Sequence, residues 1–195
     1  MKNLIIQIRA SIICLLILVI LVCGIYPLTV WAISQTLLPE KANGSMMMVN
    51  GNLVGSSLIG QQFHDMKYFH PRPSSAGHGY DASNSGGSNL GPTSRKLMSQ
   101  VATRTVEYRR LNGLKTESPV PMDAVTSSAS GLDPHISVQN ALIQALRVSR
   151  SRGLPEEKVA ALVRHSVERP DLWLFGQDRI NVLKINLLMD EIKCD

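Results

Sequence analysis

Three side chains with the types of a hydrolytic triad stand close together in this sequence: Ser130, Asp133 and His135. A serine hydrolase needs its nucleophile, base and orienting acid to converge from different elements, whereas these three crowd into one turn. The Gly-x-Ser-x-Gly elbow that exposes many catalytic serines is also absent from the sequence. We therefore interpret the stretch as a tight turn shaped by Gly131 and Pro134, and we expect no catalytic residue in it.

Metal binding is a second chemistry that the residue types allow. The histidines are His64, His70, His78, His135 and His165. None of them pairs with another at the spacing of helical or zinc-finger ligands. We therefore expect scattered surface histidines and no metal site.

Phosphate binding is a third chemistry, because a glycine-rich run covers Ser85–Gly91. Its backbone N–H groups could wrap around an anion. The run lacks the Lys-Ser/Thr ending of a Walker loop and does not follow a predicted strand. From the residues alone, a turn that lies close to neighbouring backbone is the better interpretation.

This run lies inside a longer segment, Pro71–Pro92, that is rich in proline, glycine, serine and asparagine. Such a composition is typical of a flexible linker, but a loop of this length inside a compact domain is either disordered or functional. Because so many glycines and prolines imply specified backbone angles, we predict that the segment is ordered.

The N-terminal part of the chain must be placed relative to a membrane. Residues 10–34 carry no charged side chain, and about 20 apolar residues suffice for a helix to span a bilayer. A cleaved signal peptide, with 30–32 as its cleavage site, is the alternative. The apolar run exceeds a signal h-region, and Tyr26 and Trp31 fit an interfacial aromatic belt. We predict an N-tail at 1–9, a transmembrane helix at 10–34 and one domain at 35–195.

The orientation follows from the flanking charges. Lys2 and Arg9 precede the helix, while Glu40 and Lys41 nearly cancel after it. The positive-inside rule then predicts a cytoplasmic N-tail and an extracytoplasmic domain in a cell membrane.

Cysteine usage and net charge argue against two further classes of protein, a domain stabilised by disulfides and a nucleic-acid-binding protein. Cys14 and Cys23 lie in the predicted helix and cannot reach Cys194, so no disulfide framework is expected. The net charge of +5 comes partly from the arginine-rich stretches 104–110 and 147–152. These lack the interleaved aromatic residues of a nucleic-acid groove, and we expect no nucleic-acid partner.

The remaining chain predicts a mixed α+β domain. Met46–Val54 is typical of a β-hairpin around Asn50-Gly51, and Ser57–Phe63 favours a short strand or a turn of helix. We expect three further helices. The first opens near Thr93 or Ser94 and stops before Gly113, and the second begins after Ser137 and buries Val138, Ala141, Leu142, Ala145 and Val148. The third has Pro155 in its first turn and directs Val159, Leu162, Val163 and Val167 inward. Ile180–Ile192 fits a helix, with a buried strand at its start left open.

Several blocks together resemble one family, the C subunit of the Kdp potassium-transporting P-type ATPase. They are Gly55–Gln61, Tyr68–Ser74, Ser85–Pro92, Val120-Pro121 with Asp123, Val125-Thr126, Ser128–Ser137, Gln144, Arg147-Val148, Asn181–Leu183 and Asn186. The blocks occur in the family's order and cover nearly the whole chain. Ala124 stands where a leucine is usual and Ser149 where an alanine is usual, and neither departure changes the assignment.

The resemblance implies an accessory, non-catalytic subunit of a high-affinity potassium uptake complex. Its partners would be a potassium-translocating subunit, a P-type subunit that hydrolyses ATP, and a small membrane subunit. The family's proposed roles are assembly and a raised ATP affinity of the hydrolytic subunit. The present chain has no Asp-Lys-Thr-Gly phosphorylation motif.

The nucleotide role rests on a likeness of Ser85, Gly86, Gly87, Ser88 and Asn89 to the Ser-Gly-Gly-Gln signature of ABC ATPases. ATP is cytoplasmic, and an external domain cannot touch it. We therefore expect no tightly bound cofactor, and an effect on ATP affinity that reaches the hydrolytic subunit as a coupling free energy.

Partner contacts are expected at two places. In the apolar helix, Gly24 would let a partner helix approach closely, and Pro27 frees a backbone carbonyl that a partner could satisfy. In the domain, the candidates are Tyr68, Arg72, Asp133 and His135. The rival hypothesis is a membrane-tethered external enzyme or binding protein that uses the Pro71–Pro92 loop.

Overall fold

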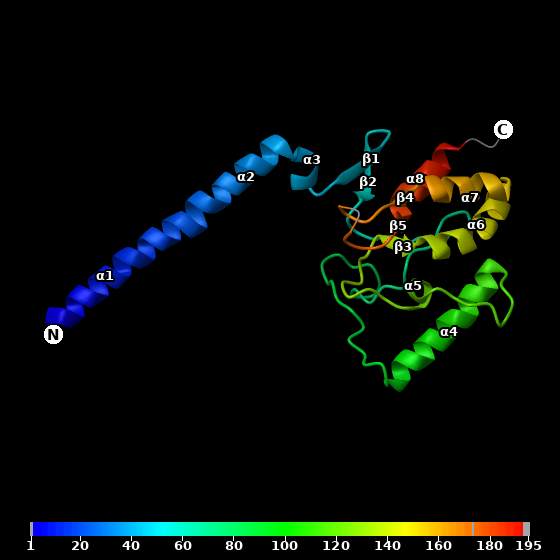
Figure 1. Cartoon of the computed structure of the whole chain (residues 1–195), viewed down its shortest axis with the longest axis horizontal. Helices are drawn as coiled ribbons and strands as arrows, with labels where there is room; N and C mark the ends of the chain where they lie inside the picture. The colour runs from blue at the N-terminus through cyan, green and yellow to red at the C-terminus, as the bar shows by residue number, and fades with distance from the viewer. Residues whose placement is uncertain (1, 173, 193–195) are drawn as a thin grey trace. The chain divides into compact units, whose positions relative to one another are not determined.

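The computed structural model of the chain describes residues 2–172 and 174–192 and divides into two compact units, Met1–Met46 and Met47–Asp195 (Figure 1). The fold class is α+β, as predicted, with an N-terminal apolar helix followed by a domain of mixed helices and strands. Cys14 and Cys23 are free thiols, and Cys194 lies outside the described residues.

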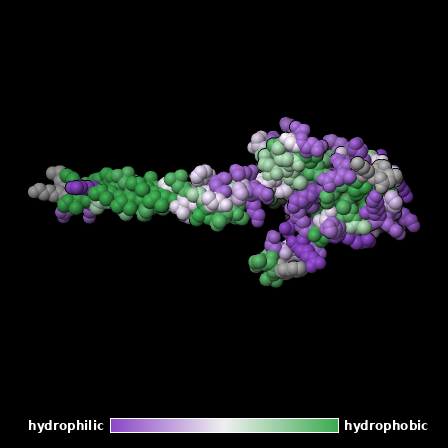
Figure 2. Space-filling view, turned by 90° about the horizontal axis from the view of Figure 1, so that it is seen from above, coloured by the Kyte–Doolittle hydropathy of each residue, from purple (hydrophilic) through white to green (hydrophobic). Residues whose placement is uncertain are grey.

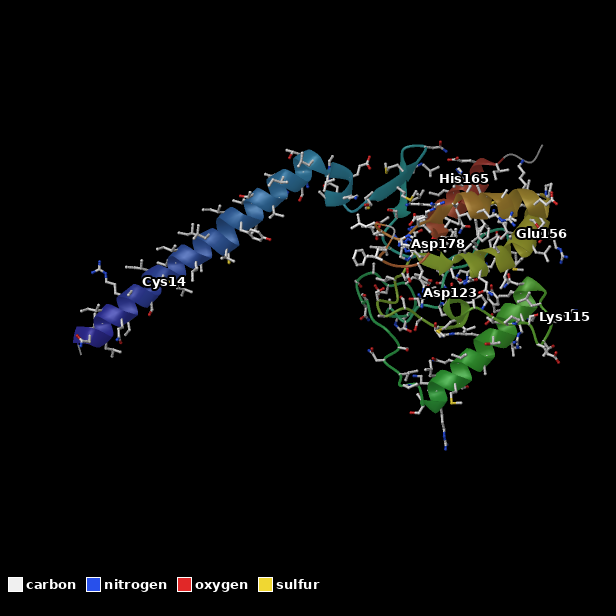
Figure 3. The ribbon with its side chains drawn as sticks, in the orientation of Figure 1. Cys14, Lys115, Asp123, Glu156, His165 and Asp178 are labelled. Atoms are coloured by element: carbon white, nitrogen blue, oxygen red, sulfur yellow. The ribbon has the colours of Figure 1, made fainter. Side chains whose placement is uncertain are left out.

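The first unit is mainly one apolar helical segment. It consists of α1 (Lys2–Val19), the π-helical stretch η1 (Ile20–Ile25) and α2 (Tyr26–Leu37), and a short α3 (Pro39–Ala42) follows. Apolar side chains cover its surface (Figure 2) and project outward from it (Figure 3). Asn3–Leu37 is the one described helix that is long and apolar enough to cross a membrane. It contains the predicted span 10–34, whose exact bounds in a bilayer stay a prediction.

The sequence did not indicate the π-helical stretch. The amide of Tyr26 donates to the carbonyl of Leu21, five residues back, in place of the usual four. Pro27 follows directly, and it has no amide to donate and disturbs the ladder around it. Gly24 lies inside this irregular turn.

The predicted β-hairpin is confirmed. Strands β1 (Met46–Val49) and β2 (Asn52–Ser56) are joined by Asn50 and Gly51. Their φ angles of +50° and +80° are those a type I′ turn requires.

The strand or helical turn expected at Ser57–Phe63 is wrong. The segment has no regular secondary structure, because its hydrogen bonds go to groups elsewhere in the chain and not to a neighbouring strand. The amide of Gly60 donates to the carbonyl of Leu132, and the side chain of Gln61 donates to the carbonyl of Val54.

Local signals located the starts of three helices of the second unit correctly, whereas the short helix Met122–Val125 was not predicted. Helix α4 (Arg95–Asn112) begins after Ser94, whose hydroxyl accepts from the amide of Leu97, and ends at Gly113 with φ +65°. Helix α6 (Val138–Arg152) begins after Ser137, whose hydroxyl accepts from Asn140. The other helices are α5 (Met122–Val125), α7 (Glu156–His165) after Pro155, and α8 (Val182–Glu191) after Asn181.

A small antiparallel sheet lies beside these helices. Its strands are β3 (His135–Ser137), β4 (Val167–Glu168) and β5 (Arg179–Asn181), in the order β3-β5-β4. The strand left open at the start of the last apolar segment is therefore present. The placement of Val167 in a helix is wrong, because α7 ends at His165 and Val167 pairs with Ile180 in the sheet.

The core lies between α6, α7, α8 and the sheet, and α6 and α7 run side by side (Figure 1). Its buried apolar side chains are Phe69, Ile136, Ala141, Ala145, Val148, Val159, Val163, Ile180, Val182, Ile185 and Met189. Val138, Leu142 and Leu162, which we expected to be buried, are partly buried at its edge.

Candidate functional site

The Pro71–Pro92 loop folds onto the turn that contains the triad-like residues. The hydroxyl of Ser74 donates to the carbonyl of Gly131 at 2.7 Å. The amide of Gly86 donates to the carbonyl of Ser130 at 2.9 Å. We call the surface formed by residues 72–89 and 127–135 the loop–turn site.

Close backbone approach makes glycine necessary at Gly131, the centre of the site. Its φ is +70°, and a Cβ there would lie 2.6 Å from the amide nitrogen of Ala76 and 2.6 Å from the carbonyl oxygen of Gly86. Gly87 likewise lies against Ala129, whose carbonyl oxygen would be 2.9 Å from an added Cβ. The predicted close approach of the glycine-rich run to neighbouring backbone is confirmed at Gly87, but residues 85–91 form no turn.

Two buried side-chain amides hold the segment that leads into the loop. Asn186 accepts from the amide of Phe69 at 2.8 Å and donates to its carbonyl at 3.0 Å. Gln144 does the same for His70, at 2.7 and 3.1 Å. Each residue thus satisfies both backbone groups of its partner, as a neighbouring strand would.

A chain of polar and charged side chains, which we call the charged network, runs from the loop to the sheet. Arg72 Nη1 lies 2.9 Å from Asp133 Oδ2, His135 Nδ1 lies 3.4 Å from Asp133 Oδ1, and His135 Nε2 lies 3.2 Å from Glu168. Lys184 Nζ lies 2.6 Å from Glu168. The structure thus brings three of the predicted partner-contact residues, Arg72, Asp133 and His135, into one network.

The network lowers the pKa of both carboxylates. Burial alone would raise the pKa of Asp133, but hydrogen bonds from His135 and the charge of Arg72 outweigh it. Burial also raises the pKa of Glu168, but Lys184 and His135 lower it by more, so the net effect is a decrease. Both groups are therefore held as carboxylates.

The triad-like residues do not form a triad among the described residues. The hydroxyl of Ser130 accepts from the amide of Leu132, while both ring nitrogens of His135 face carboxylates. The amide of Gly131 donates to the carbonyl of Ser128, so the predicted tight turn is confirmed.

The nucleotide-associated candidates form part of the loop–turn site. The hydroxyl of Ser85 and the amide of Gly86 both donate to the carbonyl of Ser130. These two donors hold the loop and do not converge on a phosphate position. Ser88 and Asn89 are exposed, and Asn89 has a φ of +51°. A role of these residues toward ATP stays a prediction.

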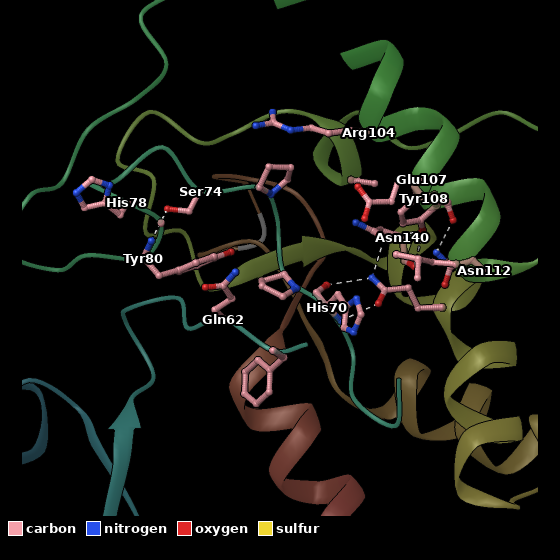
Figure 4. Close-up of a pocket in the computed structure, with 17 residues that line it drawn as sticks. Gln62, His70, Ser74, His78, Tyr80, Arg104, Glu107, Tyr108, Asn112 and Asn140 are labelled. Atoms are coloured by element: carbon pink, nitrogen blue, oxygen red, sulfur yellow. Dashed lines mark hydrogen bonds between the residues drawn. The ribbon is translucent and has the colours of Figure 1, made fainter. Parts of the chain in front are cut away.

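A pocket of about 360 Å³ opens between the loop and α4 (Figure 4). Its polar lining includes His70, His78, Tyr80, Arg104 and Glu107. Burial, followed by the charge of Arg147, lowers the pKa of His70, and burial raises the pKa of Tyr80. No sequence signal marked the α4 side of this pocket, because Arg104 and Glu107 have side chains that are typical of a solvated helix surface.

Tyr68, another predicted contact residue, has its contacts outside the charged network. Tyr68 donates to Asp190 of α8 at 3.0 Å, and the guanidinium of Arg152 lies 5.1 Å from the centre of its ring. Gly24 and Pro27 belong to the first unit. A Cβ added at Gly24 would meet nothing within 4 Å.

Sequence reasoning missed the structural role of two acidic residues. Asp123 accepts from the amide and the hydroxyl of Ser137 and from the side chain of Asn140, and so fixes the start of α6. Glu168 joins His135 to Lys184. Asp123 stood in a motif that carries the resemblance, whereas no sequence signal marked Glu168.

Within residues 2–172 and 174–192, no group of three or more histidine, cysteine or acidic side chains could hold a metal ion.

Comparisons with known proteins agree with these features. A protein-family model described as "K+-transporting ATPase, c chain" matches residues 8–191. A protein of Nitratidesulfovibrio vulgaris is 52% identical over 186 residues, which cover 95% of this chain and 94% of the relative. Relatives from Mycobacterium bovis and Rhodospirillum rubrum are 45% and 49% identical, covering 95% and 85% of this chain and 98% and 86% of theirs. All three are named "Potassium-transporting ATPase KdpC subunit".

The chain thus joins a helix that is long and apolar enough to cross a membrane to an α+β domain that carries the loop–turn site. The chain belongs to the KdpC family of potassium-transporting ATPase subunits.

Proposed function

We propose that this chain is a non-catalytic accessory subunit that a potassium-transporting ATPase complex requires for assembly. The main support is the helix Asn3–Leu37, whose most apolar stretch is not buried by any other part of the chain. Lipid and the helices of other subunits would cover such a surface. The partners would be the potassium-translocating, the ATP-hydrolysing and the small membrane subunit. Lys2 and Arg9, which precede the uncharged stretch 10–34, favour a cytoplasmic N-terminus and an external second unit.

We also propose that any effect on ATP affinity is indirect. An external domain and cytoplasmic ATP are separated by the membrane, and the donors of Ser85 and Gly86 are engaged with Ser130. The effect would then be a coupling free energy between sites on different subunits.

The assembly role is tested with Gly24→Leu. Outside the helical turn around Gly24, no described atom lies within 4 Å of a Cβ built there, so the larger side chain would obstruct a neighbour from outside the chain. We expect the yield of assembled complex to fall, while Ala10→Leu, the matched control on the same helix, leaves it unchanged. Equal yields for both variants would contradict a close helix contact at Gly24.

The non-catalytic role is tested with Ser130→Ala, Asp133→Ala and His135→Ala. Complex yield and potassium-stimulated ATPase activity per assembled complex are measured for each. We expect activity to be lost only where yield falls, with near-normal turnover in whatever assembles. A complex that forms in normal yield and is inactive after one of these changes would refute the proposal.

The pocket beside α4 favours a second candidate, an external binding protein tethered by its helix. Its lining of histidine, tyrosine, Arg104 and Glu107 could bind a small polar ligand. Co-purification separates the two functions. A binding protein would be monodisperse in detergent without partners, whereas a subunit would leave the membrane together with them.

A further inference from the structure

The pocket between the loop and α4 contains two opposite charges that do not pair with each other. Arg104 and Glu107 both line it, one turn apart on α4, so they share a face of that helix. The side chain of Arg104 donates to the carbonyl of Val125 at 3.1 Å. In the part of the chain that the structure describes, no carboxylate pairs with Arg104 and no cation pairs with Glu107. One cation and one anion are thus available to a ligand at the same opening.

The charges in and around the pocket balance. With its two histidines counted as neutral, the lining has one positive and one negative side chain, Arg104 and Glu107. A simple anion would meet the carboxylate of Glu107, and a simple cation would meet the guanidinium of Arg104. The charges that act on Tyr80, Tyr108 and His70 from behind the lining also balance: Arg72 with Asp133, Arg147 with Asp123, and Lys67 with Asp65. A ligand with one charge of each sign therefore fits this pocket better than a simple ion.

The floor of the pocket is formed by buried amides that are already engaged. Asn140 and Gln144 line the pocket and are each 1% exposed. Asn140 accepts from the hydroxyl of Tyr108 at 2.8 Å and from Gln144 at 2.9 Å. Gln144 also pairs with both backbone groups of His70. The floor is thus in place before a ligand arrives, which lowers the entropy cost of binding.

Aromatic rings form much of the remaining wall. Phe63, Tyr80 and Tyr108 line the pocket, and Figure 4 shows Tyr80 on the loop side, with Arg104 and Glu107 on the α4 side. The volume of about 360 Å³ lies within the range of small-molecule sites. Rings of this kind bury an apolar group, and their faces attract an ammonium group.

We propose that this pocket binds a small zwitterion, an amino acid with an uncharged side chain. Its carboxylate accepts hydrogen bonds from Arg104, whose planar guanidinium matches a carboxylate. Its ammonium pairs with Glu107 at the opening, and its side chain lies against the aromatic rings. A charged side chain would bring a third charge, for which the lining has no partner. Every lining residue belongs to the second unit, so the site goes beyond the subunit function and needs no partner chain.

The test measures binding of each standard L-amino acid by isothermal titration calorimetry. It uses the full chain, purified in detergent with any partner that accompanies it. We expect amino acids with uncharged side chains to bind, and acidic and basic ones to bind about tenfold more weakly or less. The absence of binding by every amino acid, or equal binding of the charged ones, would overturn the proposal.

Two analogues of the tightest-binding amino acid test the need for both charges. One lacks the ammonium group and the other lacks the carboxylate. We expect each to bind about tenfold more weakly or less, because each loses one charge-assisted hydrogen bond. An analogue that binds as tightly as the amino acid would show a site for a simple ion, and the zwitterion would be refuted.

Glu107→Gln and Arg104→Gln locate the ligand in the pocket. Each should bind the amino acid about tenfold more weakly or less, and Glu107→Gln should leave binding of the analogue without an ammonium group unchanged. Glu117→Gln and Arg95→Gln are the matched controls, because they remove exposed charges outside the pocket, and both should bind as the wild type does. Glu107 is exposed, so its variant should keep the wild-type melting curve. Wild-type affinity in Glu107→Gln would contradict the site even if Arg104→Gln did not fold.

Recovery of partner subunits, measured on the same preparations, separates this site from the subunit function. If the wild-type chain recovers partners but binds no amino acid, only the ligand site fails. If it binds an amino acid but recovers no partner, only the subunit function fails.

Discussion

Replacing Asn186 with alanine would release the segment that leads into the loop. The side chain of Asn186 is buried and makes both hydrogen bonds of the Phe69 backbone, while Phe69 itself is fully buried in the core. Alanine leaves one donor and one acceptor without partners, and water reaches neither. Each unsatisfied buried group costs about 1–3 kcal/mol, so we expect a loss of about 2–6 kcal/mol in the free energy of unfolding.

The assay is denaturant unfolding of the purified chain in detergent, followed by circular dichroism. Asn186→Asp refines the test, because a carboxylate still accepts from the Phe69 amide but faces the Phe69 carbonyl without a donor. We expect it to be destabilised as well. Gln139→Ala is the control on the exposed face of α6, where substitutions stay within about 0.5 kcal/mol.

A second measurement links stability to the loop–turn site. Since Phe69 lies immediately before His70 and Pro71, its release should loosen the loop, and limited proteolysis should cut within 71–92 faster than in the wild type. A loss below about 1 kcal/mol, with unchanged proteolysis, would refute the assigned role of Asn186.

Three further predictions follow from orientation, burial and backbone geometry. A reporter fused after Asp195 should be active only outside the cytoplasmic membrane, and a cytoplasmic signal would reverse the proposed orientation. Burial lowers the pKa of His70 in the folded state, so the unfolded state takes up the proton first as the pH falls. Stability should therefore decrease as the pH drops below about 6.5. In melting curves recorded at several pH values, His70→Gln should flatten this dependence. Gly131→Ala should lower the melting temperature and expose the loop to protease, whereas Gly153→Ala, also at positive φ but with open space around it, should cost less.

Helices α4, α6 and α7 were predictable because their signals are local, whereas α5 was not predicted. Ser94 and Ser137 cap through hydroxyls that accept amides three residues on, and Gly113 takes the left-handed angle that ends α4. The hairpin was predictable for the same reason, since Asn50-Gly51 alone specifies its turn.

The three-stranded sheet was not predictable, because its strands have two or three residues and show no periodicity. Val167 continued the apolar spacing of α7, and only its pairing with the distant Ile180 places it in β4. The candidate site divides in the same way. The turn around Gly131 could be interpreted locally, but the contacts that join Arg72 to Asp133 and His135 to Glu168 depend on long-range folding.

Side-chain amides take the place of a sheet in the irregular half of this domain. Asn186 and Gln144 pair with Phe69 and His70, and Asn181 donates to the carbonyl of Ser57. All three amides belong to the blocks that carry the family resemblance. The resemblance therefore includes the side chains that form hydrogen bonds to the irregular backbone. An amide can satisfy one N–H and one C=O at once, whereas an aliphatic residue of similar size satisfies neither. The shape of the loop–turn site is thus determined by buried residues of α6 and α8 as much as by the exposed residues of the loop itself.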